Sequence, residues 1–119
     1  MQLVTQDTAA VVLPSVDSSV RRLARFFPST TPVRFPVRVT GKGTRVEDLR
    51  EQTRIEFGSA DTVLFGCELP LELNDLVFLR SPDKSFEAEA IVVAMLYCNG
   101  GRAVAARFTS EVPNWIIKP

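Results

Sequence analysis

The segment LPLELNDLVFLRSPDKSFEAEAIVV, Leu69–Val93, decides the fold. The residues LELND at Leu71–Asp75 predict a turn before an apolar strand at Leu76–Arg80. The sequence SPDKS, Ser81–Ser85, contains the Pro and Asp that are typical of a tight hairpin turn. The next predicted strand, Phe86–Cys98, starts with alternating residues and becomes continuously apolar. Two strands joined by a short turn indicate an antiparallel sheet.

Four more strands are predicted on either side of this hairpin. They are Val33–Thr40, Thr53–Phe57, Thr62–Leu69 and Arg102–Phe108. The first alternates cleanly between apolar and polar residues, and Pro36 on its polar face suggests an edge or bulge position. Six strands with short connections and no helix-strand repeat predict a mainly all-β domain. A closed antiparallel β-barrel is favoured because it leaves no long open edges.

The residues before the first strand are predicted to form an N-terminal extension, 1–31, ahead of a barrel domain at 32–119. Ser18 and Ser19 are good helix-capping residues, and a short amphipathic helix is predicted after them. Its apolar face carries Val20, Leu23 and Phe27, and its polar face carries Arg21, Arg22 and Arg25 of the sequence RRLAR. Two interpretations of these arginines stay open: a solvated helix face, or a clamp for an anionic ligand.

The charges of the chain exclude several classes of function. Fourteen basic and fourteen acidic residues cancel among 119 residues, so the chain lacks the overall positive field of a general nucleic-acid binder. We expect no DNA or RNA partner. The longest apolar run, Ile91–Leu96, is far shorter than the roughly 20 residues of a membrane-spanning helix. No membrane insertion is expected, and with no evident secretion signal the cytoplasm is the expected location.

The polar side chains do not suggest catalysis. The chain has no histidine, and its two cysteines, Cys67 and Cys98, are not spaced as metal ligands. Histidine-dependent nucleophilic and acid-base mechanisms are therefore impossible. The thiols are predicted to be small apolar fillers rather than a disulfide. We expect no enzyme activity, no catalytic residue, no metal and no cofactor.

Five phenylalanines are predicted to point into the barrel. The inward positions are assigned to Phe35, Phe57, Phe65, Phe78 and Phe108. An oligonucleotide-binding barrel would instead need outward aromatic residues with basic neighbours. The C-terminal Trp115 is predicted to belong to a tail that folds over one end of the barrel, although an apolar docking surface is an alternative.

This order of strands resembles the PilZ domain, a bacterial receptor module for the second messenger cyclic di-GMP. The resemblance covers Pro32–Trp115 and is strongest over Leu69–Val93. It also includes PVRV at the first strand, TRIEFGSADTV at the second strand and its loop, and RAVAARF at the closing strand. The resemblance implies a six-stranded barrel that binds a ligand through two motifs. These are RxxxR before the barrel and [D/N]xSxxG after the second strand.

The resemblance implies ligand contacts at Arg21, Arg22, Arg25, Ser59 and Asp61. Arg21 and Arg25 fit RxxxR, although they lie farther from the first strand than the family pattern implies; Arg34 and Arg38 also fit this spacing but lie inside the strand. Ser59 matches the serine of the second motif, and Asp61 offers a displaced carboxylate. Guanidinium groups suit both the phosphates and the guanine edges of cyclic di-GMP.

The second motif is incomplete in this sequence. Phe57 stands in place of the acidic residue or asparagine, and Thr62 stands in place of the glycine. Ala105 likewise stands where the family commonly has a glycine in the closing strand. A PilZ-like regulatory module that binds cyclic di-GMP is therefore predicted, with binding weakened or lost. The alternative is a nucleotide-independent adaptor that binds a protein partner, and an unrelated oligonucleotide-binding barrel ranks last.

Overall fold

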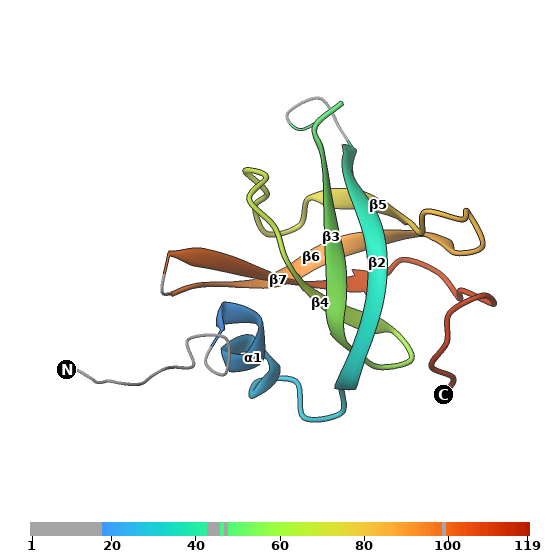
Figure 1. Cartoon of the computed structure of the whole chain (residues 1–119), viewed down its shortest axis with the longest axis horizontal. Helices are drawn as coiled ribbons and strands as arrows, with labels where there is room; N and C mark the ends of the chain where they lie inside the picture. The colour runs from blue at the N-terminus through green and yellow to red at the C-terminus, as the bar shows by residue number, and fades with distance from the viewer. Residues whose placement is uncertain (1–17, 43–45, 47, 99) are drawn as a thin grey trace, which may run out of the picture.

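The computed structural model describes residues 18–42, 46, 48–98 and 100–119 (Figure 1). One short helix precedes six strands, which close into a barrel in the spatial order β2-β3-β4-β7-β6-β5. Every neighbouring pair is antiparallel. The elements are α1 Ser19–Ala24, β2 Thr31–Lys42, β3 Arg50–Gly58, β4 Thr62–Gly66, β5 Leu76–Arg80, β6 Glu87–Cys98 and β7 Gly101–Phe108. The predicted six-stranded antiparallel barrel is confirmed, whereas residues 1–17 of the predicted extension lie outside the described residues.

The hairpin at the centre of the sequence forms as predicted. β5 pairs with β6 from Leu76 opposite Ile91 to Arg80 opposite Glu87. The turn between them is held by the Asp83 carboxylate, which accepts hydrogen bonds from the hydroxyl of Ser81 at 2.8 Å and from the backbone N–H of Ser85 at 3.0 Å. A side chain that bonds nearby backbone groups in this way stabilises a turn locally.

The barrel interior is filled by the inward residues of all six strands. Val39, Ile55, Val63 and Leu79 are completely buried there, as strict alternation along a strand requires. At one end of the barrel, four aromatic rings pack against each other. They are Phe35, Phe86, Phe108 and Trp115, with neighbouring ring centroids between 5.2 and 6.1 Å apart.

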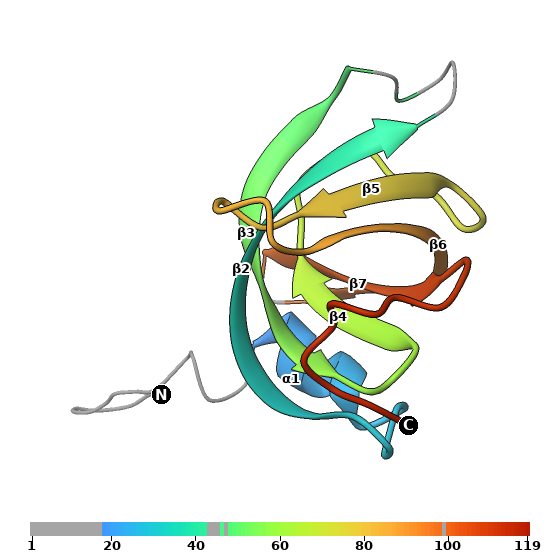
Figure 2. The ribbon, with the colours of Figure 1, turned by 90° about the vertical axis from the view of Figure 1, so that its right-hand side faces the viewer.

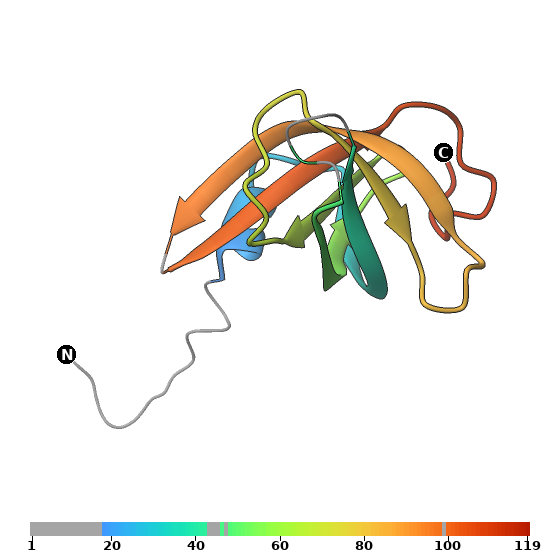
Figure 3. The same ribbon diagram turned by 90° about the horizontal axis from the view of Figure 1, so that it is seen from above.

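A second apolar core lies outside the barrel, beneath α1. Val20 and Leu23 of the helix pack with Leu64 of β4 and with Ala103 and Ala105 of β7. Figures 2 and 3 show the helix against this wall of the barrel, beside β4 and next to β6 and β7. The small alanine side chains leave room for the helix to approach the sheet.

The outer core also explains the continuously apolar part of β6. A bulge interrupts its pairing with β7 between Val92 and Ala94. Val92 and Met95 contact the barrel interior, whereas Ala94 and Leu96 belong to the core beneath α1. Both faces of this part of the strand are therefore covered by protein, and a strand covered on both faces loses its alternating pattern.

Two of the five phenylalanines do not point inward as predicted. Phe57 packs with the outer core beneath α1, because the pairing of β3 with β4 shifts register between Ile55 and Phe57. Phe78 lies between the buried residues Val77 and Leu79, so the period of two directs it outward. The guanidinium of Arg80 lies 5.6 Å from the centre of its ring.

Candidate functional site

A basic groove of about 210 Å³ lies where α1 meets the start of β2 and the end of β3. Its walls carry three arginines from three different elements: Arg21 of α1, Arg34 of β2 and Arg54 of β3. The remaining lining residues are Ser18, Pro32, Val33, Glu56 and Phe57. We call this site the Arg21 groove. It is a candidate anion-binding site, because guanidinium groups bind phosphate and carboxylate through pairs of N–H donors.

Local structure places each of these arginines in the groove. Ser18 caps α1, its hydroxyl accepting a hydrogen bond from the backbone N–H of Arg21 at 3.2 Å. Arg34 is exposed on β2 within the register shift between Pro32 and Phe35. Arg54 is exposed on β3 and lies opposite Pro36 of β2. The antiparallel register therefore brings the two strand arginines to one outer wall.

The charge of the Arg21 groove is predominantly positive. Glu56 is the one acidic side chain among its lining residues. Neither Arg34 nor Arg54 forms an ion pair with another residue in the described part of the chain. Exposed guanidinium groups without a carboxylate partner are available to a ligand.

The turn Gly58–Thr62 contains the two other predicted ligand residues, and their side chains bond within the turn. The Ser59 hydroxyl donates to the Asp61 carboxylate at 3.1 Å and accepts from the backbone N–H of Thr62 at 3.2 Å. The Thr62 hydroxyl also donates to Asp61, at 3.0 Å. These contacts give Ser59 and Asp61 a local structural role.

The C-terminal tail closes the barrel next to this turn. Trp115 is 1% exposed, and its indole Nε1 donates a hydrogen bond to the Ser59 carbonyl at 2.7 Å. The indole also occupies the space beside Gly58, where an added Cβ would lie only 2.8 Å from Cζ2 of the ring. The prediction that Trp115 belongs to a tail folded over a barrel end is confirmed.

The structure brings some, but not all, of the predicted ligand residues to the Arg21 groove. Arg21 lines it, whereas Arg22 and Arg25, farther along the helix, do not. Ser59 and Asp61 are also absent from its walls. They lie two and four positions after Phe57, which does line it. As a ligand residue, Arg54 was missed by sequence reasoning, because its position near Arg34 depends on the β2–β3 register.

The thiol of Cys67, whose pKa is raised, does not belong to a candidate site in the described part of the chain. Burial raises the pKa of Cys67 to about 12 and keeps it protonated. Its sulfur lies 3.7 Å from Oε1 of Glu51, which also accepts a hydrogen bond from the backbone N–H of Glu68 at 2.8 Å. Within the described ranges, no group of three or more Cys, Asp or Glu residues could hold a metal ion. Nor does any helix of those ranges have the length and apolar character needed to cross a bilayer.

Comparison with solved structures finds a protein of similar fold. The structure of the Bacillus subtilis inhibitor of motility, MotI/DgrA, a PilZ-domain protein, matches 71% of this chain with a TM-score of 0.57. The fold is PilZ-like. The sequence identity is 15%, so the match concerns the fold alone, and the chain covers 43% of the length of MotI/DgrA. No family model and no curated protein matches the sequence.

The PilZ-like fold and the outer core together define the surroundings of the Arg21 groove. The groove lies on the outside of the barrel, bounded on one side by α1, and not in the barrel interior. Side chains of all six strands and Trp115 pack together in the interior. Any ligand of the groove therefore contacts the helix and the outer strands at once.

Proposed function

We propose that this protein is a regulatory module of the PilZ family that binds cyclic di-GMP at the Arg21 groove. The observation that carries the proposal is the convergence of Arg21, Arg34 and Arg54 from three elements. A phosphodiester placed among them receives charge-assisted hydrogen bonds from several directions. The PilZ-like fold supports the choice of ligand, because the family resemblance implies this nucleotide.

The size of the groove determines how a cyclic dinucleotide would bind. At about 210 Å³ it is smaller than the roughly 300–1,000 Å³ of most small-molecule pockets. One phosphate then enters the groove, and the rest of the ligand lies over its rim. Arg22 of α1 and Arg25 at its C-cap are proposed to contact this outer part, and Ser59 and Asp61 to support the adjoining turn.

Ligand binding would be transmitted through α1. The helix contacts β3, β4, β6 and β7 and shares an apolar core with β4 and β7. A nucleotide that binds Arg21 and the outer strands together would favour the docked position of the helix. By binding one arrangement more tightly, the ligand shifts the population of exposed surfaces that a protein partner can recognise.

Calorimetric titration with cyclic di-GMP tests the proposal. We expect a dissociation constant near the micromolar range, about 8 kcal/mol of binding free energy. Arg21→Gln and Arg54→Gln should each weaken binding by about tenfold or more, because each removes charge-assisted hydrogen bonds. Arg107→Gln is the matched control, since Arg107 is an exposed arginine of β7 outside the groove. The absence of both heat and a melting-temperature shift at millimolar nucleotide would refute the proposal.

A nucleotide-independent adaptor is the second candidate. It is favoured by the turn Gly58–Thr62, where Ser59 and Asp61 already satisfy each other without a ligand. The Phe57 side chain, at the position of the family's acidic residue or asparagine, packs with the core beneath α1. In this case titration with cyclic di-GMP gives no heat of binding, and Arg21→Gln and Arg54→Gln bind the protein partner as the wild type does.

A further inference from the structure

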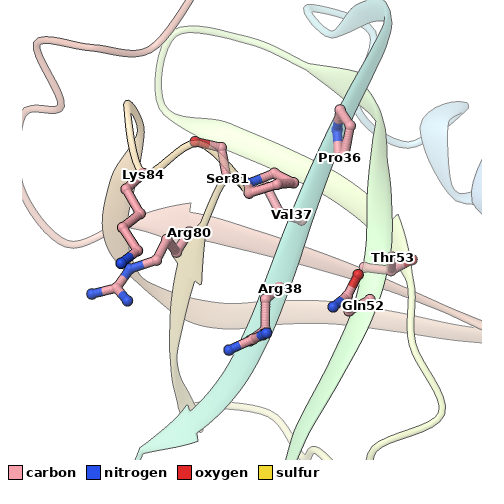
Figure 4. A pocket seen from close by; sticks show the side chains of 9 residues that line it. Pro36, Val37, Arg38, Gln52, Thr53, Arg80, Ser81 and Lys84 are labelled. Carbon is pink, nitrogen blue, oxygen red and sulfur yellow. The ribbon is translucent and has the colours of Figure 1, made fainter.

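A second basic hollow, of about 200 Å³, lies farther along β2 than the Arg21 groove, where β2 and β3 meet the turn that follows β5 (Figure 4). Among the side chains labelled in Figure 4 are Arg38 on β2, Gln52 on β3, Arg80 at the end of β5 and Lys84 in the turn. We call it the Arg38 hollow. It shares no lining residue with the Arg21 groove.

The charges around the Arg38 hollow are of one sign. Arg38, Arg80 and Lys84 line it, and no acidic residue does. Arg38 lies directly opposite Arg80 in the β2–β5 register. Like charges at directly opposed positions destabilise a sheet. An anion bound between them would turn this repulsion into attraction.

Two cations, one on β2 and one on β5, have acidic partners on β6. Lys42 forms an ion pair with Glu89 at 2.6 Å, and Arg80 forms one with Glu87 at 2.8 Å. In contrast, neither Arg38 nor Lys84 has an ion-pair partner among the described residues. With Arg80 compensated by Glu87, two positive charges of the hollow stay unbalanced.

Arg80 is held in position before any ligand arrives. Its guanidinium lies near Oε2 of Glu87 and over the ring of Phe78. The Nε atom makes no hydrogen bond within the described part of the chain, so the Glu87 contact is an ion pair of unfavourable hydrogen-bond angle. Contacts of this kind restrict the side chain in advance, so binding a ligand costs less side-chain entropy.

The SPDKS turn places Lys84 at the rim. Lys84 has a φ of 64°, and its backbone N–H donates to the Ser81 carbonyl at 2.9 Å. The neighbouring Asp83 carboxylate is occupied by the hydroxyl groups of Ser81 and Ser85, at 2.8 and 2.7 Å. The turn thus keeps its acid in hydrogen bonds of its own and leaves the ammonium group for the hollow.

We propose that the Arg38 hollow binds a phosphate group of a small-molecule anion, independently of the Arg21 groove. Two guanidinium groups and an ammonium group approach from β2, β5 and the turn, and three directions of approach suit a tetrahedral phosphate better than a planar carboxylate. The Gln52 amide adds a neutral donor from β3. The hollow is smaller than typical pockets for drug-sized molecules, so its volume favours a compact ligand.

Titration of the full chain with pyrophosphate, in phosphate-free buffer, tests this site by calorimetry and by ³¹P NMR line broadening. We expect saturable binding that Arg38→Gln and Lys84→Gln each weaken about tenfold or more, while Arg107→Gln and Arg21→Gln leave it within twofold of wild type. Melting curves of all four variants confirm that the fold is retained. Orthophosphate serves as a second, smaller probe and should bind more weakly than pyrophosphate, because it has fewer oxygens and less charge.

Several results would overturn the proposal. No saturable binding at millimolar pyrophosphate would do so, as would equal losses in Arg38→Gln and Arg107→Gln, which indicate diffuse charge attraction. Binding to phosphatidylglycerol vesicles without binding to pyrophosphate would assign the charge to a membrane surface instead. Loss of pyrophosphate binding in Arg21→Gln would also overturn it, because Arg21 lines only the Arg21 groove.

Discussion

Replacing Trp115 by alanine should destabilise the barrel more than any other change in the C-terminal tail. The indole is 1% exposed and lies 5.3 Å from the ring of Phe35, 5.2 Å from that of Phe86 and 5.8 Å from that of Phe108. It also donates the 2.7 Å hydrogen bond to the Ser59 carbonyl. The substitution removes three aromatic contacts and one hydrogen bond and opens the barrel end.

Two routes give the magnitude. Truncation of a buried Trp to Ala typically costs about 3–5 kcal/mol. Burial of roughly 150–250 Å² of aromatic surface at about 25 cal/mol per Å² gives about 4–6 kcal/mol as an upper bound. Each kcal/mol lowers the melting temperature of a domain of this size by about 4–8 °C. The expected fall in melting temperature is therefore more than about 10 °C.

Circular dichroism melts and urea unfolding measure this change, because both detect the whole barrel. Trp115→Phe is the matched variant, since it keeps an aromatic ring but removes the indole N–H. Its extra cost relative to wild type should be about 1–3 kcal/mol, from the smaller ring and the Ser59 carbonyl left without its partner. A melting temperature of Trp115→Ala within about 3 °C of wild type would refute the idea that the tail closes the barrel.

Gly58 provides an internal check on the same contact. A Cβ at this position would lie 2.8 Å from Cζ2 of Trp115, so Gly58→Ala should cost about 1–3 kcal/mol through overpacking. In the Trp115→Ala background the ring is absent and this cost should nearly vanish. Such coupling is expected of residues in direct contact. Equal costs in both backgrounds would show that the close approach does not determine which residue is tolerated at position 58.

Three further predictions concern other parts of the fold. Leu23→Ala should lower the free energy of unfolding in urea by about 2–5 kcal/mol, because Leu23 is buried beneath α1. Arg21→Ala on the exposed face should change it by less than about 0.5 kcal/mol. Similar values for the two variants would show that the helix is not docked. The Cys67 thiol, whose pKa burial raises to about 12, should resist an aromatic disulfide reagent at pH 8 in the native Cys98→Ser variant and react in urea, and rapid native reaction would contradict its burial. Hydrogen bonds from Ser85 lower the pKa of Asp83 from its ordinary value of 3.8 to about 2. The stability that this carboxylate adds is therefore complete above about pH 4 and is lost as the pH falls through about 2. Asp83→Asn should melt at a lower temperature than wild type at pH 7, and the difference in melting temperature should shrink between about pH 4 and about pH 2.

Most of the barrel could be predicted from the sequence, because short-range pattern and turn chemistry specify strands. The hairpin Leu76–Cys98 shows this most clearly: its turn residues and its alternation locate both strands to within a residue. The strand predicted at Thr62–Leu69 ends earlier, at Gly66. Apolar residues continue to Leu69 because this connection packs on the barrel core. Apolar character alone therefore overstated the length of that strand.

The candidate site was predicted less completely. Arg21 was selected by its spacing in RRLAR, and the structure places it in a groove with Arg34 and Arg54. The contribution of Arg54 depends on which strand lies beside which and in what register, and one sequence does not state that register. The Arg38 hollow was missed for the same reason, since Arg38 and Arg80 are 42 positions apart in the chain (80 − 38) and become neighbours only through the β2–β5 pairing.

The sequence by itself determined the number and order of the strands, the capped helix before them and the folding of the Trp115 tail onto the barrel. These features follow from periodicity and turn residues within a few positions of each other. Only the tertiary structure decided which face of each strand is inside. Phe57 and Phe78 point outward because a register shift and strand alternation direct them there, and the outer wall of β4, β6 and β7 is apolar because α1 covers it. Which arginines share a surface depends on the same long-range pairing, which brings together residues that the chain keeps far apart.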